Sequence, residues 1–283
     1  MMSLFFRVMC LVMLAGGVGL ATGCGEGAAP GGDGETGRLT ITGSSTIAPL
    51  ASEMAKRYEQ RHPGVRIDVQ TGGSSRGVAD ALQGLAEIGM VSRTLKDEES
   101  QLDAVKIALD GVAVIVHADN PVGELSREQI IEIYTGKIND WSEIEGAGEG
   151  PITVVNKAEG RSTLELFLHH LGLENSQIQA DVVIGDNQQG IKQVAGDPRA
   201  IGYVSIGTAE SSAEAGVTIR ALPLEGVPAT IASVRSGAFP LSRPLNLVTF
   251  GPRGGLAEAF LEFASSGEVN DIIEGLYFVP IAD

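Results

Sequence analysis

Three glycine- and serine-rich turns carry the side chains of this sequence that could bind an anion. They occupy residues 43–46 (Gly-Ser-Ser-Thr), 72–77 (Gly-Gly-Ser-Ser-Arg-Gly) and 157–163 (Lys-Ala-Glu-Gly-Arg-Ser-Thr). Each follows a predicted strand and precedes a predicted helix. A helix start presents unpaired backbone N–H groups and the positive end of the helix dipole, which together with hydroxyl groups suit an oxyanion. The three turns therefore predict one anion held from several sides.

Each turn also has a simpler interpretation as a helix cap. Serine and threonine are preferred N-cap residues in proteins of any function. Lysine or arginine occurs in two of the three turns, so the set as a whole favours an anion site. Several neighbouring side chains are expected to be structural: Arg76 on a helix surface, Arg93 paired with one of Asp97, Glu98 and Glu99, Tyr203 in the core, and residues 186–190 as a cap or a pocket wall.

The elements that position these turns alternate between strand and helix. In the first third of the chain, residues 38–42, 65–69 and 88–91 are predicted strands, and apolar stripes with helical spacing lie between them, the second over Val78, Leu82 and Leu85. This β-α-β-α-β order predicts a parallel sheet that binds ligands at the carboxyl ends of its strands. Further strands are expected at 112–116, 152–155, 182–184, 201–204 and 245–250, and further helices at 126–134, 164–171, 190–195 and 256–263.

Two such α/β units predict two domains. Residues 38–115 and 245–283 are expected to form domain 1 and residues 116–244 domain 2, joined by crossovers near Val116 and Pro244. A chain of 283 residues, 43% of them hydrophobic, is long enough for two packed cores. The sequence therefore predicts an α/β fold with two domains around a cleft and anion-binding turns on both walls.

The N-terminus has the pattern of a secretory signal over residues 1–23. Arg7 precedes an apolar run from Val8 to Leu20, and small residues precede Cys24. Cys24 resembles the cysteine of a bacterial lipoprotein box, which receives a lipid and becomes the mature N-terminus; the alternative is ordinary cleavage that leaves it unmodified. Residues 24–37 are predicted to form a flexible tether. The protein is thus expected outside the cytoplasm, lipid-anchored in a bacterial cell envelope.

The charge and cysteine content exclude several classes of function. The formal net charge of −16 at pH 7 argues against binding to nucleic acid and against electrostatic attraction to anionic lipid. A buried anion site remains compatible with it, because exposed charge is screened within about 10 Å. Cys10 lies in the signal, so Cys24 has no partner for a disulfide. No Walker-type loop and no Cys/His cluster occurs in the sequence, so no cofactor and no metal are expected.

Residues 73–77 match the Gly-x-Ser-x-Gly nucleophile elbow of serine hydrolases, with Ser75 as the nucleophile. A hydrolase also needs an acid and a histidine later in the chain and an oxyanion-hole motif earlier. His169 and His170 fall within a predicted helix, His117 lies beside a predicted crossover, and no His-Gly-Gly motif occurs. A binding protein is therefore expected in preference to an enzyme.

Five motifs occur in an order that resembles a known family. They are 42–46 (TGSST), 72–77 (GGSSRG), 88–93 (IGMVSR), 157–163 (KAEGRST) and 200–205 (AIGYVS). Together they resemble the phosphate-binding proteins of phosphate ABC transporters, over nearly all of the chain after the tether. The resemblance implies a type II periplasmic-binding-protein fold with two crossover strands. It also implies that the protein, which is expected to be a monomer, closes on phosphate and delivers it to a membrane permease.

The same resemblance implies a set of ligand residues. In the third turn the family usually reads Arg, two residues, then Gly-Ser-Gly-Thr; here Lys157 takes the arginine position, and Arg161 and Ser162 replace Ser-Gly. Ser92 stands where well-known members have the aspartate that accepts the phosphate proton. Sulfate, molybdate or a phosphonate is therefore an alternative ligand, and adhesion or signalling is an alternative role. The implied ligand residues are Ser45, Thr46, Ser74, Ser92, Lys157, Arg161, Ser162 and Thr163.

Cys24 is predicted to carry a lipid anchor. Cys24→Ser should remove the acceptor thiol, so the protein should appear in a soluble fraction or remain an uncleaved precursor. Membrane fractionation followed by intact-mass analysis measures this, with the unaltered chain as control. An unmodified Cys24 at the mature N-terminus of the unaltered chain would contradict the prediction.

Overall fold

The computed structural model describes residues 36–252 and 254–281. The signal peptide, Cys24 and most of the predicted tether lie outside these residues. The tether prediction was wrong for Thr36 and Gly37, which begin the first strand because they pair with Gly64 and Val65 of the second. Among the helices that the structure describes, none has the length and apolar character needed to cross a membrane.

The described chain contains the predicted strands and helices in the predicted order, together with three helices and two strands that the sequence did not predict. The strands are β1 (Thr36–Gly43), β2 (Gly64–Thr71), β3 (Ile88–Val91), β4 (Leu102–His117), β5 (Thr153–Lys157), β6 (Val182–Ile184), β7 (Ala200–Ser205), β8 (Ile219–Ala221), β9 (Ser242–Phe250) and β10 (Val279–Pro280). The α-helices are α1 (Ala48–Arg61), α2 (Ser74–Leu82), α3 (Arg127–Tyr134), α4 (Ser162–Leu171), α5 (Asn187–Gly196), α6 (Ile206–Glu214), α7 (Ile231–Arg235), α8 (Gly255–Ala264) and α9 (Asn270–Gly275).

Hydrogen bonding links the strands in the order β2-β1-β3-β9-β4-β7-β5-β6, with β8 and β10 also paired to β4. β1 is parallel to both β2 and β3, as the β-α-β-α-β pattern predicted. β5 is likewise parallel to β6 and β7. The carboxyl ends of these strands are therefore available to position the turns that follow them.

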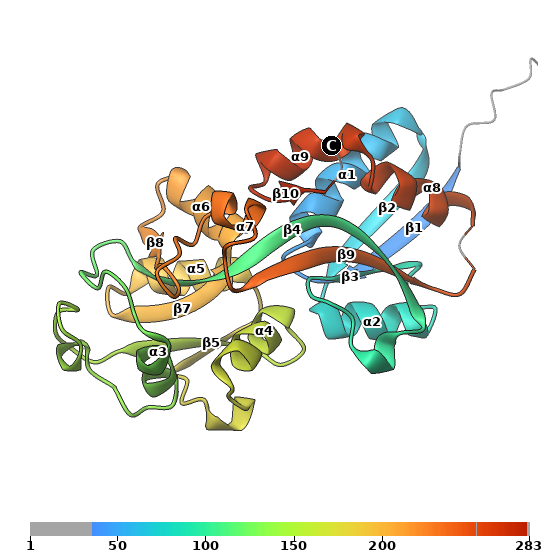
Figure 1. The fold of residues 1–283 in the computed structure, drawn as a ribbon. Coiled ribbons are helices and arrows are strands. Elements are labelled where there is room, and N and C mark those ends of the chain that lie inside the picture. The colour runs from blue at the N-terminus through green and yellow to red at the C-terminus, as the bar shows by residue number, and fades with distance from the viewer. Residues whose placement is uncertain (1–35, 253, 282–283) are drawn as a thin grey trace, which may run out of the picture. The chain divides into compact units, whose positions relative to one another are not determined.

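Two long antiparallel strands connect the two parallel groups. Residues 102–111 of β4 pair with β9, whereas residues 112–116 pair with β7. Figure 1 shows β4 and β9 running side by side from the β1–β3 group toward β7. The sequence predicted only residues 112–116 of β4, because exposed and buried positions mix irregularly over the preceding ten residues. The division into two domains stays a prediction.

Each parallel group has its own hydrophobic core. In the first, α1, α8 and α9 pack on one side of β1, β3 and β9, with Leu50, Met54 and Phe260 among the buried side chains. The second surrounds β5, β7, α3 and α4, where Phe167 stacks on Tyr203 with ring centroids 3.9 Å apart. The prediction of Tyr203 as a core residue is confirmed.

The opposite side of the first group is covered by α2, which packs against β3, β9 and β1. Val78 belongs to a small core on this side together with Val91 and Val248. The predicted apolar stripe was wrong at Leu85, which lies beyond the end of α2 and is 65% exposed. The helix ends earlier because the chain turns at Gly84, which has a φ of +67°.

Three glycines let α2 begin directly against the sheet. A Cβ atom on Gly77 would lie 2.8 Å from the carbonyl oxygen of Thr42 and 2.9 Å from that of Met90. On Gly43 it would lie 2.4 Å from the same Met90 oxygen, and on Gly89 2.4 Å from the Gly77 oxygen. Backbone therefore packs on backbone here. This contact accounts for the last glycine of the Gly-x-Ser-x-Gly pattern without a catalytic role.

Gly77→Ala should lower the free energy of unfolding by about 1–3 kcal/mol, because the added methyl group would overlap two backbone oxygens in a packed sheet. Gly196→Ala is the matched control, since a Cβ there meets no atom within 4 Å. The control should leave stability unchanged or raise it by up to about 1 kcal/mol. Denaturant unfolding measures both variants, and equal stability of the two would contradict the packing account.

Candidate anion-binding site

A small pocket lies where the three glycine- and serine-rich turns meet. The space between its lining atoms, part of it open to solvent, is about 210 Å³. The lining residues are Ser44, Ser45, Thr46, Gly73, Ser74, Ser92, Lys157, Arg161, Ser162 and Thr163. All eight predicted ligand residues are therefore brought together. The narrow space favours a compact ligand.

Three helices begin at this pocket without a side-chain cap. Ser74 is the first residue of α2, Ser162 is the first of α4, and Thr46 lies two residues before α1. At none of these three starts does the N-cap side chain accept a hydrogen bond from the helix backbone. The helices α3, α5, α6 and α7 do have such caps, while α8 and α9 do not. The serines and threonines of the three turns therefore do not serve as N-cap side chains for these helices.

Hydroxyl groups of the first two turns form a buried network with Ser92. The Ser44 Oγ donates to the Ser92 Oγ at 2.9 Å. The Ser92 backbone N–H donates to the Ser74 Oγ at 3.1 Å, and the Ser74 and Ser92 hydroxyls lie 3.5 Å apart. All three side chains are buried. This network fixes the hydroxyl positions on the wall formed by β1, β3 and α2.

Arg243 of β9 lies beneath the pocket and is a residue that the sequence analysis missed. Its guanidinium pairs with the Asp110 carboxylate of β4 at 2.8 Å, and both side chains are fully buried. It also donates to the Thr163 Oγ1 at 3.0 Å and to the Thr46 Oγ1 at 3.2 Å. The available signal was an arginine immediately before Pro244, but the predicted strand began only at residue 245.

Lys157, at the end of β5, points its ammonium group into the same region. The Nζ donates to the Asn187 Oδ1 at 2.8 Å, and the Asn187 Nδ2 donates to the Thr46 Oγ1 at 3.2 Å. Burial, together with the positive charges of Arg243 and Arg161, lowers the pKa of Lys157 to about 7. In the free protein these surroundings disfavour the protonated form of Lys157. A bound anion would favour that form again, because it adds a negative charge nearby.

Residues 186–190 combine the two roles that were considered for them. The Asp186 carboxylate caps α5 by accepting from the Gln189 N–H at 2.8 Å. The next side chain, Asn187, is buried and joins Lys157 to Thr46. Asn187 is therefore a supporting residue of the site, although it does not line the pocket.

Two buried polar atoms at the pocket have no hydrogen-bond partner within the described part of the chain. They are the Arg161 Nε and the Ser162 Oγ. Burial of an unpaired donor costs free energy, about 1–3 kcal/mol for a neutral group and more for a charged one. Both residues line the pocket, so an oxyanion there could accept hydrogen bonds from both.

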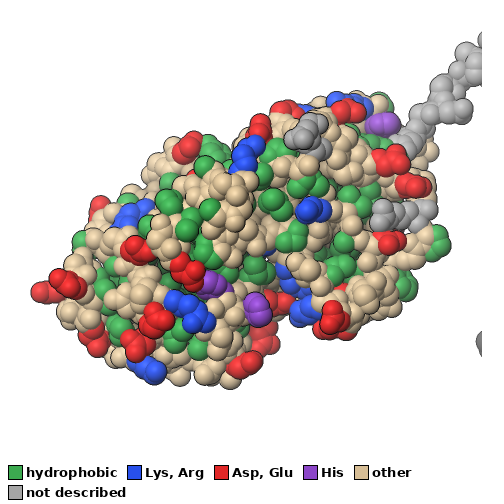
Figure 2. Space-filling view, in the orientation of Figure 1, with side chains coloured by type: hydrophobic (Ala, Val, Ile, Leu, Met, Phe, Trp, Pro, Cys, Tyr) green, Lys and Arg blue, Asp and Glu red, His purple; other side chains and the backbone are tan. Residues whose placement is uncertain are grey.

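Glu165 of α4 forms ion pairs with basic residues of the segment that follows β3, at one edge of the pocket. Its carboxylate lies 2.9 Å from the Arg93 Nε and 3.3 Å from the Lys96 Nζ. Arg93 also pairs with Glu99, as predicted. These residues lie near a hollow that Figure 2 shows between α4 and α2, with basic and histidine side chains at its rim.

Ser75 also faces Glu165, which bears on the hydrolase alternative. The Ser75 Oγ donates to the Glu165 Oε1 at 3.3 Å, and the Ser75 N–H donates to the Gly160 carbonyl at 3.3 Å. A nucleophile elbow would require the hydroxyl to donate to a histidine. The observed contacts instead make Ser75 part of the link between α2 and the third turn. Arg76 lies on the exposed face of α2, as predicted, and pairs there with Asp80.

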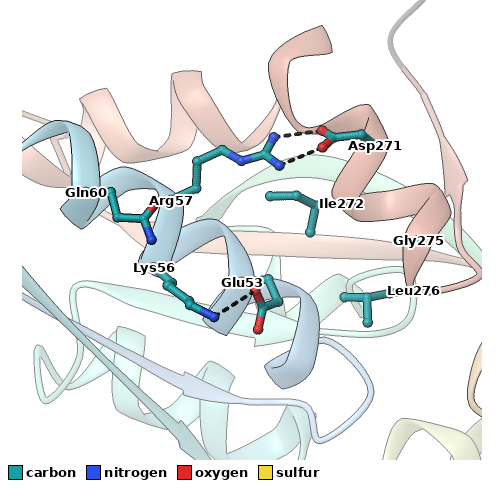
Figure 3. Close-up of a pocket in the computed structure, with 8 residues that line it drawn as sticks. All are labelled: Glu53, Lys56, Arg57, Gln60, Asp271, Ile272, Gly275 and Leu276. Carbon is teal, nitrogen blue, oxygen red and sulfur yellow. Dashed lines mark hydrogen bonds and ion pairs between the residues drawn. The ribbon is translucent and has the colours of Figure 1, made fainter.

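A second, more open pocket lies between α1 and α9 (Figure 3) and is lined by none of the residues of the three turns. Its charged side chains are paired with one another: Arg57 with Asp271 at 2.6 Å, and Lys56 with Glu53 at 3.7 Å. Because the positive charges of Arg57 and Lys56 are paired with carboxylates and partly exposed to water, they would attract an anion only weakly. Within residues 36–281 as described, no group of three or more His, Cys, Asp or Glu side chains could hold a metal ion.

Comparison with known proteins decides the family. The family model described as the PBP superfamily domain matches residues 28–268. The chain belongs to the PBP superfamily. Within this superfamily it groups with the phosphate-binding proteins of phosphate ABC transporters, as the five ordered motifs predicted. The predicted periplasmic-binding-protein fold is confirmed by the same relatives.

Three relatives within the PBP superfamily illustrate the similarity. A Clostridium perfringens protein, described as a phosphate ABC transporter substrate-binding protein and solved with bound phosphate, is 32% identical with a TM-score of 0.80, covering 87% of this chain and 100% of that chain. The phosphate-binding protein PstS of Bacillus subtilis is 28% identical, covering 100% of this chain and 94% of that protein. An ABC-type phosphate transport receptor from Vibrio cholerae is 27% identical with a TM-score of 0.68, covering 86% and 99%.

The lowered pKa of Lys157 predicts proton uptake when an anion binds. At about pH 8.5 the lysine of the free protein is mostly neutral, and a bound dianion should raise its pKa, so up to about one proton should be taken up. At about pH 6 the lysine is already charged and uptake at this residue should vanish, so the affinity for the dianion, corrected for the ionisation of phosphate itself, should fall as pH rises through 7.

Calorimetry with inorganic phosphate, in buffers of different ionisation enthalpy, measures this uptake. Lys157→Arg is the matched variant, because a guanidinium stays charged and should bind without taking up a proton. If the unaltered chain and Lys157→Arg take up the same number of protons at about pH 8.5, the proton binds a group other than Lys157 and the prediction is wrong.

Proposed function

We propose that this chain is an extracytoplasmic solute-binding protein that captures phosphate between its three turns and delivers it to the permease of an ABC transporter. The observation that carries the proposal is the convergence of three helix starts without side-chain caps on one narrow pocket that also receives Lys157 and Arg161. Backbone N–H groups, hydroxyls and cations are the groups that hold a dehydrated oxyanion. The proposed role is binding and not catalysis, because the Ser75 hydroxyl donates to Glu165 and not to a histidine.

The identity of the relatives supports phosphate as the anion. The Clostridium perfringens protein was solved with phosphate bound, and the chain spans all of its length. A monoprotonated phosphate needs an acceptor as well as donors. The Ser162 hydroxyl can supply one, because it is buried, lines the pocket and has no partner within the described residues. Sulfate carries no such proton, so competition between the two anions measures how much this acceptor contributes.

The cellular setting follows from the N-terminal pattern. We propose that lipid on Cys24 holds the monomer at the membrane near its permease, with the residues after Cys24 as tether. We also propose that the two crossover strands join two domains that close on the anion. Scattering curves that are identical with and without saturating phosphate would reject closure.

Thr46→Ala and Thr163→Ala should each weaken phosphate binding about 10- to 150-fold, because each hydroxyl is expected to donate to a charged, desolvated ligand. Arg161→Ala should weaken it at least as much. Isothermal titration calorimetry with phosphate, sulfate and molybdate measures the affinities and the preferred anion. Thr135→Ala is the matched control, since the Thr135 hydroxyl bonds to the Ile131 carbonyl within α3 and its following turn.

The proposal fails at the site if Thr46→Ala and Thr163→Ala bind phosphate as tightly as the Thr135→Ala control. It fails at the ligand if the unaltered chain binds sulfate or molybdate and leaves phosphate unbound.

A further inference from the structure

Arg243 and Asp110 lie directly opposite each other on the two crossover strands. Their Cα positions are register partners in the antiparallel pairing of β9 with β4. The next β4 residue, Gly111, is the last to pair with β9, and Val112 begins the pairing with β7. The ion pair therefore sits where the chain passes between the two parallel groups, beneath the pocket.

The Arg243 guanidinium reaches both walls of the pocket at once. One donated bond goes to the Thr46 Oγ1, before α1, and another goes to the Thr163 Oγ1, in α4. A third, longer contact of 3.5 Å reaches the Ser92 Oγ. Arg243 itself does not line the pocket. Three of its hydrogen bonds go to hydroxyls that do line it, and the other two go to Asp110.

These contacts determine which way the threonine hydroxyls donate. A hydroxyl has one proton, and an oxygen that accepts from a guanidinium must direct that proton elsewhere. Thr46 Oγ1 accepts from both Arg243 and Asn187. The proton of Thr46, like that of Thr163, must therefore point away from the guanidinium. This leaves both hydroxyls able to donate toward a ligand in the pocket that they line.

Asp110 keeps the guanidinium in this position. Its Oδ2 accepts from the Arg243 Nε at 3.1 Å and from the Nη2 at 2.8 Å. Its Oδ1 accepts from the Ser205 Oγ at 3.0 Å and from the Gly207 N–H at 3.3 Å. A carboxylate held by these groups from two further elements fixes a planar arginine more firmly than it would fix a flexible lysine.

We propose that Arg243, held by Asp110, is a positioning residue of the anion site that orients the Thr46 and Thr163 hydroxyls as donors and links the two pocket walls. This inference rests on the proposed function, because the oriented donors are the ones that would hold phosphate. Arg243 acts through the two threonines and not by touching the anion.

The test compares affinities for inorganic phosphate by calorimetry, using the full chain. The variant Asp110→Asn/Arg243→Gln removes both charges together, so no buried charge is left unpaired and the fold should survive. Its affinity should fall about 10- to 100-fold, with a melting temperature near that of the unaltered chain. Arg127→Lys is the control, because Arg127 bonds to the His170 carbonyl away from the pocket, and its affinity should not change.

Coupling to Thr163 separates positioning from a merely structural role. In a Thr163→Ala background the same double substitution should cost clearly less than in the unaltered chain, since part of what Arg243 orients is already gone. Losses that simply multiply, or a double variant that binds as tightly as the unaltered chain, would overturn the inference.

If the variant Asp110→Asn/Arg243→Gln does not fold, Arg243→Lys tests the positioning role instead. It keeps the charge opposite Asp110 but cannot hold both threonines in one plane, so affinity should drop at least about fivefold with an unchanged circular dichroism spectrum. Affinity equal to that of the Arg127→Lys control would overturn the inference. If the unaltered chain binds no phosphate at all, the proposed function fails first, and the two failures are distinct.

Discussion

Buried positive charge is the constraint on which the rest of the site depends. Lys157, Arg161 and Arg243 gather around one narrow pocket, and Asp110 compensates only one of them directly. Burial of a cation without a partner costs free energy, and the pKa of Lys157 is lowered for this reason. A small oxyanion would relieve this cost, because the anion supplies the missing negative charge and could bond to the Arg161 Nε and the Ser162 Oγ, which have no partner within the described residues.

The fold meets this constraint by bringing strand ends together. Close packing at Gly43, Gly77 and Gly89 sets α2 tightly against β1 and β3, which places Ser74 at the pocket. The second parallel group contributes α4 and the end of β5. Because β4 and β9 run through both groups, the Asp110–Arg243 pair can reach hydroxyls that belong to each. Site and scaffold therefore share the same pair of strands.

Much of this arrangement could be predicted from local sequence. Strands β3 and β6 have the predicted bounds. Seven of the eight predicted ligand residues lie in the three glycine- and serine-rich turns, and the eighth, Ser92, directly follows β3; all eight line the same pocket. The roles of Arg243, Asp110 and Asn187 could not be predicted. They arise from cross-strand register and from tertiary contacts between segments far apart in the chain. Leu85 was misplaced because helical spacing alone does not reveal a turn at Gly84.

The measurement that tests the central claim most directly is a crystal structure of the protein with arsenate, a phosphate analogue whose arsenic atom can be located by anomalous scattering. The account predicts one strong arsenic peak between Thr46 and Thr163, with oxygens within about 3 Å of their hydroxyls and of the Arg161 guanidinium. A peak in the pocket between α1 and α9, or full occupancy at a surface site with none between the three turns, would contradict it.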